Sequence, residues 1–417
     1  MKVPREDLLH VNLPDAENML HLVHRKYFQH VYAMPKEGPP AEVLTKQVKR
    51  LSRICNMDLI GITSADPFDE DIRRVDEIIK DLTKMGRDEE ARRLELRKRA
   101  LVPTSIWGEA KSIIVAAQPY APPAKNSFDK KKYGRMAAVY VRDYYALVDS
   151  KIDMLGRFIE TMGYRVLRGY ARDGEGFSEL TPMDHRRGCL MVRPVARRAG
   201  LGVIGKNTLL ITKPYGSWVV LSFLMTDAPL IPDEPLKGWD PCRACDACLK
   251  ACPGKALFDE RKLIYSDCLN VTPAAQDHER LAKVGQYLWG CDVCQEVCPA
   301  NREVEHDVRE SAVRAEEALI PLRPLMEMGI MNPKVAVVAG NSGNPEFVDD
   351  LVRLGLGSDR PNKRAYAAWA LGRIGSPEAV AAIHQAASRE EDPEIKKIME
   401  EVLTRCSGSA SEQETEG

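Results

Sequence analysis

Two short cysteine motifs constrain this chain more than any other feature of its sequence. The first motif reads C-x2-C-x2-C-x3-C-P and the second reads C-x2-C-x3-C-P, and one further cysteine stands between them. The complete set is Cys242, Cys245, Cys248, Cys252, Cys268, Cys291, Cys294 and Cys298. Thiols at such close spacing converge when the chain turns, so this segment is expected to fold around something that they bind.

The spacing is typical of bacterial ferredoxins with two 4Fe–4S clusters, in which the cysteine before proline ligates the other cluster. The first cluster is therefore predicted to bind Cys242, Cys245, Cys248 and Cys298. The second is predicted to bind Cys252, Cys268, Cys291 and Cys294, with Cys268 replacing the first cysteine that the second motif lacks. This segment is thus predicted to carry electrons.

Zinc binding and disulfide formation are the alternatives. Zinc ribbons usually show two C-x2-C pairs at longer separation. Disulfides need an oxidising compartment, and the N-terminus lacks the basic start and apolar run of a secretory signal. Apolar runs such as Ser217–Met225 are too short to span a bilayer. We therefore expect a cytoplasmic protein with no membrane contact.

At 417 residues the chain is long enough for two or three domains. Strand patterns at 58–63, 111–117, 164–167, 209–212 and 218–225 alternate with helical patterns at 42–54, 70–101 and 144–162. This alternation predicts an α/β (α+β) domain over residues 41–235, after a helical lead-in at 1–40. The ferredoxin-like module is assigned to residues 236–305.

An internal repeat follows the cysteine motifs. The segment Gly340–Glu346 recurs as Gly372–Glu378, and the same shift places Pro361 on Pro393. This period of 32 residues in an alanine-rich, helical region predicts HEAT-like repeats, here over residues 306–406. The polar residues 407–417 are predicted to be disordered.

A glycine-rich segment, Gly200–Asn207, comes just before a predicted strand. It does not match a phosphate-binding loop, because Lys206 is followed by Asn207 rather than by serine or threonine. It also does not follow a strand and open a helix, as a dinucleotide-binding loop would. A sharp turn and a cofactor cradle both remain open.

The order of segments resembles the epoxyqueuosine reductase family. The similarity rests on Ala199–Thr208, Tyr215–Trp218, Thr226-Asp227 and the two cysteine motifs, followed by Asn301 and the repeats. The resemblance implies a cobalamin-binding-type domain, two clusters that feed electrons to the cobalt, and reductive removal of oxygen or another leaving group from a substrate.

The resemblance also implies site residues. Leu210 and Leu221 match strands that line the corrin ring, and Leu269 and Asp292 match positions where the ferredoxin module touches it. Arg142 and Asp143 match a segment beside the cofactor. Asp143 is equally well explained as the N-cap of the helix predicted after it.

The family's general acid is an aspartate shortly before the Gly-Leu-Gly turn. The corresponding candidates are Asp184, which matches with an offset, and His185, which titrates near neutral pH. A carboxyl group beside a corrin in a dry site would have a raised pKa and could donate a proton. Asp184 could instead cap a following helix.

Two observations indicate a paralogue rather than the queuosine enzyme itself. The family's Tyr-Leu-Thr-Ile-Glu-like stretch after the lone cysteine is replaced here by Leu269–Pro273. The formal net charge of −1 is also low for a nucleic-acid binder. We expect a ferredoxin or flavodoxin as electron donor and a small molecule or a tRNA as substrate. The alternative is a non-enzymatic electron-transfer adaptor that docks a partner on its repeats.

Overall fold

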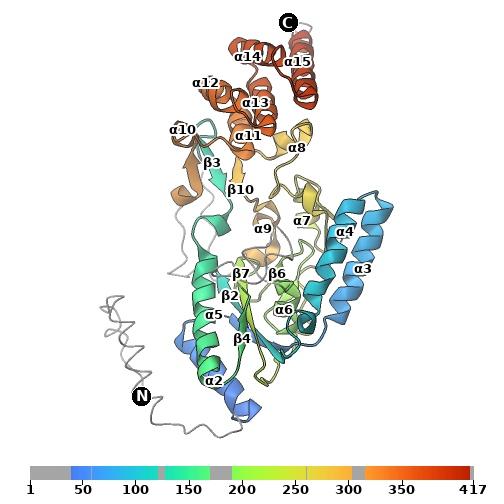
Figure 1. Ribbon diagram of the computed structural model, residues 1–417, viewed down its shortest axis with the longest axis vertical. Coiled ribbons are helices and arrows are strands. Elements are labelled where there is room, and N and C mark those ends of the chain that lie inside the picture. The colour runs from blue at the N-terminus through green and yellow to red at the C-terminus, as the bar shows by residue number, and fades with distance from the viewer. Residues whose placement is uncertain are drawn as a thin grey trace, which may run out of the picture.

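The computed structural model describes residues 39–57, 59–120, 127–169, 190–259, 261–302 and 315–413, with side chains up to Ser407. Figure 1 shows the helical repeats at one end of the molecule and a sheet covered by helices at the other, with the cysteine-bearing segment between them. No helix among these residues combines the length and the apolar character needed to cross a membrane.

The core of the first part is a four-stranded sheet in the order β1-β2-β7-β4. Its strands are β1 (Leu59–Ser64), β2 (Ser112–Pro119), β7 (Val219–Thr226) and β4 (Val166–Arg168). Every residue of β2 is buried, which explains why its sequence is almost continuously apolar. All three pairings are antiparallel.

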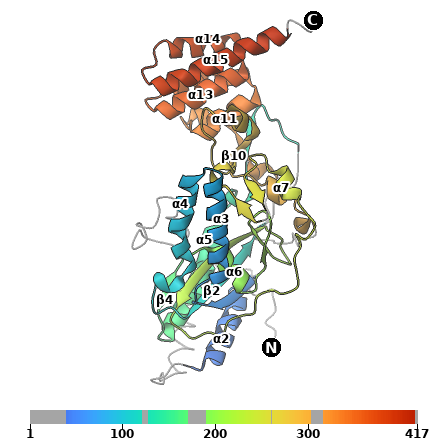
Figure 2. The same cartoon turned by 90° about the vertical axis from the view of Figure 1, so that its right-hand side faces the viewer.

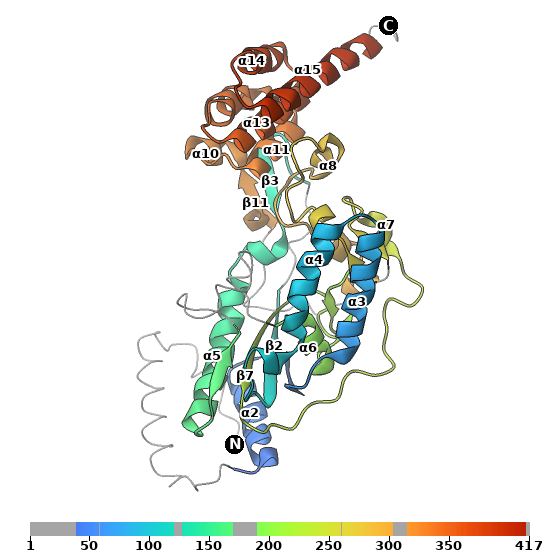
Figure 3. The ribbon, with the colours of Figure 1, turned by 45° about the vertical axis from the view of Figure 1, so that its right-hand side comes forward.

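Helices cover both faces of this sheet. Helix α2 (Ala41–Ile54) and helix α5 (Tyr144–Thr161) pack on one face through buried side chains such as Leu44, Val48 and Ile152. Helix α6 (Val192–Arg198) and part of α3 (Asp69–Lys84) pack on the other face. Helix α4 (Asp88–Arg97) lies beside α3, as Figure 3 shows.

The prediction of strands alternating with helices is correct, but an α/β domain with parallel strands is not what forms. Alternation fixes the order of elements and not the direction of neighbouring strands. Here β2 pairs with β7, which lies about a hundred residues later in the chain, and runs against it. The α+β description therefore applies.

The cysteine-bearing segment contains short elements only. They are α7 (Ala247–Ala251), β8 (Leu257–Asp259), β9 (Lys262–Leu263), α8 (His278–Lys283), β10 (Tyr287–Trp289) and α9 (Val293–Glu296). Before it, β5 (Val203–Ile204) and β6 (Leu210–Ile211) form a hairpin whose turn carries Lys206 and Asn207. Loops connect these short elements, and a small buried cluster that includes Ala256 and Leu257 lies among them.

A second sheet joins the three parts of the molecule. Strand β3 (Tyr133–Met136) lies between β10 of the cysteine-bearing segment and β11 (Leu319–Pro321), which leads into the repeats. It pairs in parallel with β10 and antiparallel with β11. Figure 3 shows β3 and β11 just beneath the repeat helices.

The repeats are helical, as the period predicts. They comprise α10 (Leu322–Glu327), α11 (Pro333–Ser342), α12 (Val348–Asp350), a π-helical stretch (Leu351–Leu356), α13 (Pro361–Ile374), α14 (Pro377–Ala387) and α15 (Pro393–Gln413). Figure 2 shows α13, α15 and α14 stacked above α11, with α14 outermost.

Two predictions concern the ends of the chain. Because α15 continues to Gln413, the prediction that residues 407–417 are disordered is wrong for the backbone of residues 407–413. The helical lead-in predicted for residues 1–40 lies outside the described residues except for its last two positions.

Candidate functional site

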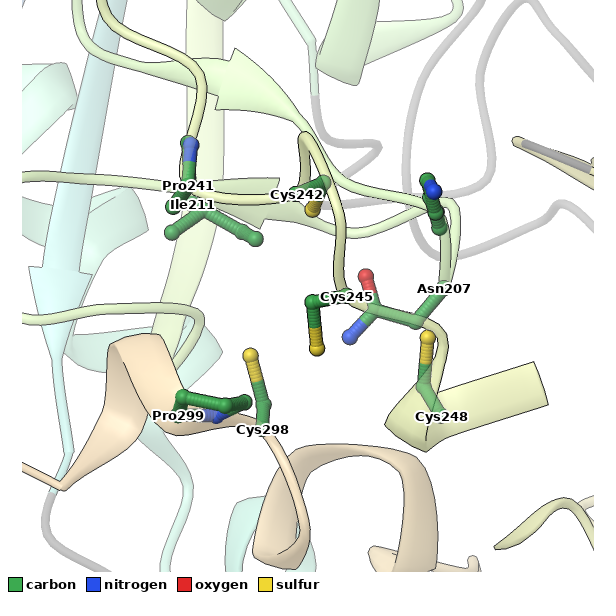
Figure 4. A pocket seen from close by; sticks show the side chains of 9 residues that line it. Asn207, Ile211, Pro241, Cys242, Cys245, Cys248, Cys298 and Pro299 are labelled. Carbon is green, nitrogen blue, oxygen red and sulfur yellow. The ribbon is translucent and has the colours of Figure 1, made fainter. Parts of the chain in front are cut away.

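The first predicted cluster site is a pocket into which four thiols point. Figure 4 shows Cys242, Cys245, Cys248 and Cys298 around a common space, together with Ile211, Pro241 and Pro299. Cys248 interacts electrostatically with the other three thiols. The cysteine before the second proline thus joins the cysteines of the first motif.

The hairpin turn between β5 and β6 closes this pocket. The backbone N–H of Lys206 donates to the Cys242 sulfur. The amide oxygen of Asn207 accepts from the Leu209 N–H at 3.2 Å, which leaves its nitrogen pointing among the thiols. That nitrogen is buried and has no hydrogen-bond partner among the described residues. A cluster with sulfur acceptors would supply one, so these residues fit a cubane.

The glycine-rich segment is therefore a cradle as well as a turn. Thr208 adopts a left-handed backbone conformation with φ 66°, which non-glycine residues rarely take. The turn is closed by the Gly205 N–H, which donates to the Leu209 carbonyl at 2.8 Å. This conformation brings Lys206 and Asn207 over the cysteines.

The second predicted group also comes together. Cys291 interacts with Cys268 and Cys252, and Cys294 interacts with Cys291 and Cys268. Burial raises the pKa of Cys291 to about 11 and that of Cys294 well above the usual range. Thiols in such a place become thiolates when bound iron supplies the compensating charge. Cys294 also interacts with Cys248, so the two groups are neighbours.

The sulfur arrangement also bears on the alternatives to iron–sulfur clusters. The described cysteines are all free thiols. Among the described residues, no three or more His, Cys, Asp or Glu side chains are placed so that they could hold one metal ion. The sulfurs are thus spread more widely than the ligands of a single zinc ion would be. A cubane spreads its thiolates over separate iron corners.

A buried hydrogen-bond network connects the second group to the first sheet. Gln295 donates to Asp292 at 2.9 Å and to the Tyr120 hydroxyl at 3.4 Å, and it accepts from the Ser217 hydroxyl at 2.9 Å. Asn301 donates to the same Ser217 oxygen at 2.9 Å. Because Tyr120 follows β2 and Ser217 precedes β7, the network seats the module on the ends of two central strands.

Asp292 is the most deeply buried carboxyl group of this network. Only 4% of its surface is exposed, and its second oxygen accepts from the Ala138 N–H at 2.7 Å. Burial raises its pKa to about 6, although the hydrogen bonds from Ala138 and Gln295 act in the opposite direction. Asp292 therefore contacts the neighbouring domain through the Ala138 N–H, and its contact with a corrin stays a prediction.

Three further side chains lie around the same strand ends. Tyr120 interacts electrostatically with Tyr145 at the start of α5 and with Cys294. Tyr145 in turn interacts with Arg193 of α6, whose guanidinium donates to the Thr208 carbonyl at 2.5 Å. The thiols of the second group therefore lie near a region bordered by both α5 and α6.

The residues assigned to a corrin by resemblance are only partly brought together. Leu210 and Leu221 share the hydrophobic cluster on the α6 face of the sheet, and Leu221 stays half-exposed there. Leu269 lies instead in the cluster formed with the repeat helices. Arg142 pairs with Glu317 at 3.0 Å, and Asp143 accepts from the Ala146 N–H as the N-cap of α5.

The two acid candidates cannot be placed in this geometry. Asp184 and His185 lie outside the described residues, as does Cys189.

Comparison with known proteins decides the family. Residues 101–170 match the model described as "Epoxyqueuosine reductase QueG, DUF1730", residues 241–301 a 4Fe-4S double cluster binding domain, and residues 334–404 HEAT repeats. The chain is 30% identical over 383 residues to an epoxyqueuosine reductase of Bacillus anthracis, covering 85% of this chain and 95% of that relative. This chain belongs to the epoxyqueuosine reductase family. It is therefore an oxidoreductase enzyme with a double 4Fe–4S domain.

Solved structures of epoxyqueuosine reductase have the same fold. One, with an epoxyqueuosine-modified tRNA-Tyr stem loop, has a TM-score of 0.71 and 25% identity and covers 88% of this chain and all of its own. Another, from Bacillus subtilis with its catalytic loop swung out of the active site, has a TM-score of 0.70 and 26% identity, covering 87% of this chain and 99% of its own. Membership of an enzyme family disfavours the adaptor alternative.

Several residues of this family member could not be selected from the sequence. Tyr120, Ser217 and Gln295 carry no motif of their own, and their network becomes visible only when strand ends and module are in contact. Asn207 was within the glycine-rich segment, and Asn301 was within the resemblance, but neither had a predicted contact.

Proposed function

We propose that this enzyme passes single electrons from a ferredoxin or flavodoxin through two 4Fe–4S clusters to a cobalamin held beside the first sheet. The assignment of the ligands is that of the sequence, with Cys242, Cys245, Cys248 and Cys298 on one cluster and Cys252, Cys268, Cys291 and Cys294 on the other. Bound cobalamin would supply a low-valent cobalt that can cleave a carbon–oxygen bond in the substrate.

The observation that carries this proposal is the network between Asp292, Gln295 and the strand ends at Tyr120 and Ser217. It fixes the second group of thiols against the domain that would hold the acceptor. An electron-transfer module that passed its electrons to a separate protein would not need this fixed contact with the first domain. The partly exposed Leu221 would offer apolar surface to the corrin, and the buried Leu210 belongs to the same hydrophobic cluster.

The proposed role of the remaining residues is proton supply. Removing oxygen from an epoxide consumes two electrons and two protons and releases water, so a donor is needed near the substrate. Asp184 or His185 would serve as that donor. Because Asp143 caps α5 and Arg142 is paired with Glu317, these two would position the edge of the site rather than react.

The first substrate candidate is an epoxide-bearing nucleoside in tRNA, because the chain matches a structure with such a stem loop over nearly its whole length. A small-molecule substrate is the second candidate. It is favoured by the altered sequence around Asp184 and after Cys268, where this chain departs from the family pattern.

Anaerobically purified protein tests the proposal. We expect about eight iron atoms per chain and one bound cobalamin with the spectrum of a base-off species. With a reduced viologen dye, epoxyqueuosine-containing tRNA should lose its epoxide, measured by mass spectrometry of the nucleosides. Binding of that tRNA should weaken steeply with salt, because phosphate contacts release counterions.

Failure to bind cobalamin would overturn the proposed acceptor. Absence of tRNA binding even at low salt, with cobalamin bound, would exclude tRNA and leave the small-molecule candidate. A Cys291→Ser variant serves as the control, since it should keep the fold but lose turnover with the same dye.

A further inference from the structure

A buried lysine of the repeats lies next to the second group of thiols. Lys334 is in the first turn of α11 and is only 7% exposed. Its ammonium group donates to the Leu269 carbonyl at 2.6 Å, directly after Cys268 in the chain. Lys334 thus reaches from the repeats into the wall of the neighbouring cluster site.

Within the part of the chain that the structure describes, no carboxylate pairs with this ammonium. Among the described residues, its hydrogen bond to the Leu269 carbonyl is its polar contact, and none of their ion pairs includes it. Burying a lysine without a counter-charge is strongly unfavourable, as it is for other buried ions. Its place in the first turn of a helix, where the backbone favours negative charge, adds to this cost.

Two thiols of the second cluster site, those of Cys291 and Cys268, are close enough to act on Lys334 when they ionise. Burial lowers the pKa of Lys334, while the charges of Cys291 and Cys268 raise it. A cubane bound by four thiolates is negatively charged as a whole and becomes more so on reduction. It would therefore supply a counter-charge that no carboxylate of the described residues offers.

We propose that Lys334 is the counter-ion of the second cluster and raises its reduction potential, so that the repeat domain sets the energy of electron transfer. The inference rests on the ligand assignment of the proposed function. A fixed positive charge stabilises the form with one more electron, because addition of an electron increases the negative charge beside it. The repeats would then be part of the redox centre.

The test is a potentiometric titration of the holoprotein, followed by electron paramagnetic resonance of both clusters. Lys334→Met should make one-electron reduction of one cluster about tenfold less favourable, which corresponds to about 59 mV. The potential of the other cluster should stay close to its original value. Lys334→Arg, which keeps the charge, should restore most of the shift.

The control is Lys396→Met, which removes the same charge from the exposed surface of α15. It should leave both potentials unchanged. If Lys334→Met keeps about eight iron atoms per chain and neither potential moves, the inference is overturned, while the proposed function stands.

Two further outcomes are informative. Loss of one cluster in Lys334→Met but not in Lys334→Arg would support the inference, because the charge would then be needed to hold the cluster. Equal loss in both variants would overturn it, since packing rather than charge would matter. A wild-type protein without clusters would overturn this inference together with the proposed function.

Discussion

Each cysteine that precedes a proline ends one motif and lies beside the thiols of the other. Cys298 interacts with Cys242 and Cys245, although it follows Cys294 by only four residues. Cys252 interacts with Cys268 and Cys291 in the same crossed manner. The two motifs are therefore interleaved, and neither predicted cluster can form from one motif alone.

This interleaving predicts which double variants lose both clusters. Cys245→Ser and Cys298→Ser should each reduce the iron content by about half, and the double variant should lose no more, because both residues serve one cluster. Cys252→Ser combined with Cys298→Ser should lose nearly all iron. Iron per chain after anaerobic reconstitution measures this. A Cys252/Cys298 double variant that keeps half of the iron would contradict the assignment.

At the scale of elements, paired glycines explain the repeat. Gly343 and Gly375 both end helices in the left-handed conformation, with φ of 62° and 71°. Gly340 and Gly372 lie where helices touch. A Cβ on Gly340 would be 2.7 Å from the Cα of Ala370, and one on Gly372 would be 2.2 Å from a methyl carbon of Val402. The sequence period is thus a period of helix ends and close helix contacts.

Enlarging one of these contacts should separate two helices. Gly340→Val places three carbon atoms against the backbone of α13, where nothing flexible can yield, so we expect a loss of about 1–3 kcal/mol in the free energy of unfolding. The control is Ala381→Val on the exposed face of α14, which should change stability little. Thermal unfolding of the two variants is the measurement. Equal melting temperatures would show that the contact is not tight.

An ion-pair cluster joins α5 to the edge strand β4. Asp153 accepts from Arg168 at 2.5 Å and from Arg157 at 2.9 Å, and Arg168 also pairs with Glu160. Burial alone would raise the pKa of Asp153, but the hydrogen bonds from both arginines outweigh it, so its pKa is lowered. A carboxyl group with a lowered folded-state pKa stabilises the fold above its unfolded pKa and loses this effect as the pH falls.

Asp153→Asn should therefore destabilise the protein by about 1.5–3 kcal/mol near neutral pH, the range for hydrogen bonds to charged groups. The difference from wild type should stay constant down to about pH 4, the unfolded pKa of aspartate, and shrink below it. Melting temperatures across this range measure the effect. Asp349→Asn, at an exposed position, is the control. A difference independent of pH below this point would show that the carboxylate charge is not responsible.

The elements differ in how far the sequence could predict them. Cysteine motifs and glycine pairs are predictable because local spacing fixes their chemistry, and helices such as Tyr144–Thr161 follow from local periodicity and an N-cap. The direction of the strands and the hydrogen bonds of Gln295 depend on contacts between segments that are far apart in the sequence. Nothing in the sequence distinguishes Lys334 from a surface lysine. Only the packing of α11 against Leu269 makes it a buried charge.

At the scale of the whole molecule, β3 prevents the three parts from being independent. It comes from the first part of the chain but pairs with β10 of the cysteine-bearing segment and with β11 before the repeats. Arg135 of β3 also pairs with Glu296 at 2.6 Å and stacks on Tyr287, 4.5 Å from the ring centre. The domain limits predicted from sequence therefore divide segments that share one sheet.

A single position in β3 tests this connection. A Cβ on Gly134 would lie 2.5 Å from two carbon atoms of Leu288, which is fully buried, and 3.2 Å from Val338 of α11. Gly134→Ala should therefore loosen the cysteine-bearing segment and the repeats together, at a cost of about 1–3 kcal/mol. Gly108→Ala is the control, because its nearest atom is 3.9 Å away.

The readouts are iron retention on exposure to air and limited proteolysis. Gly134→Ala should lose iron faster than wild type and should release the repeats as a fragment at a lower protease concentration, since one strand holds both neighbours. Gly108→Ala should match wild type in both. Faster proteolysis of the repeats with unchanged iron retention would show that β3 holds the repeats but does not support the cysteine-bearing segment. The conclusion that β3 makes all three parts depend on one another would then be wrong.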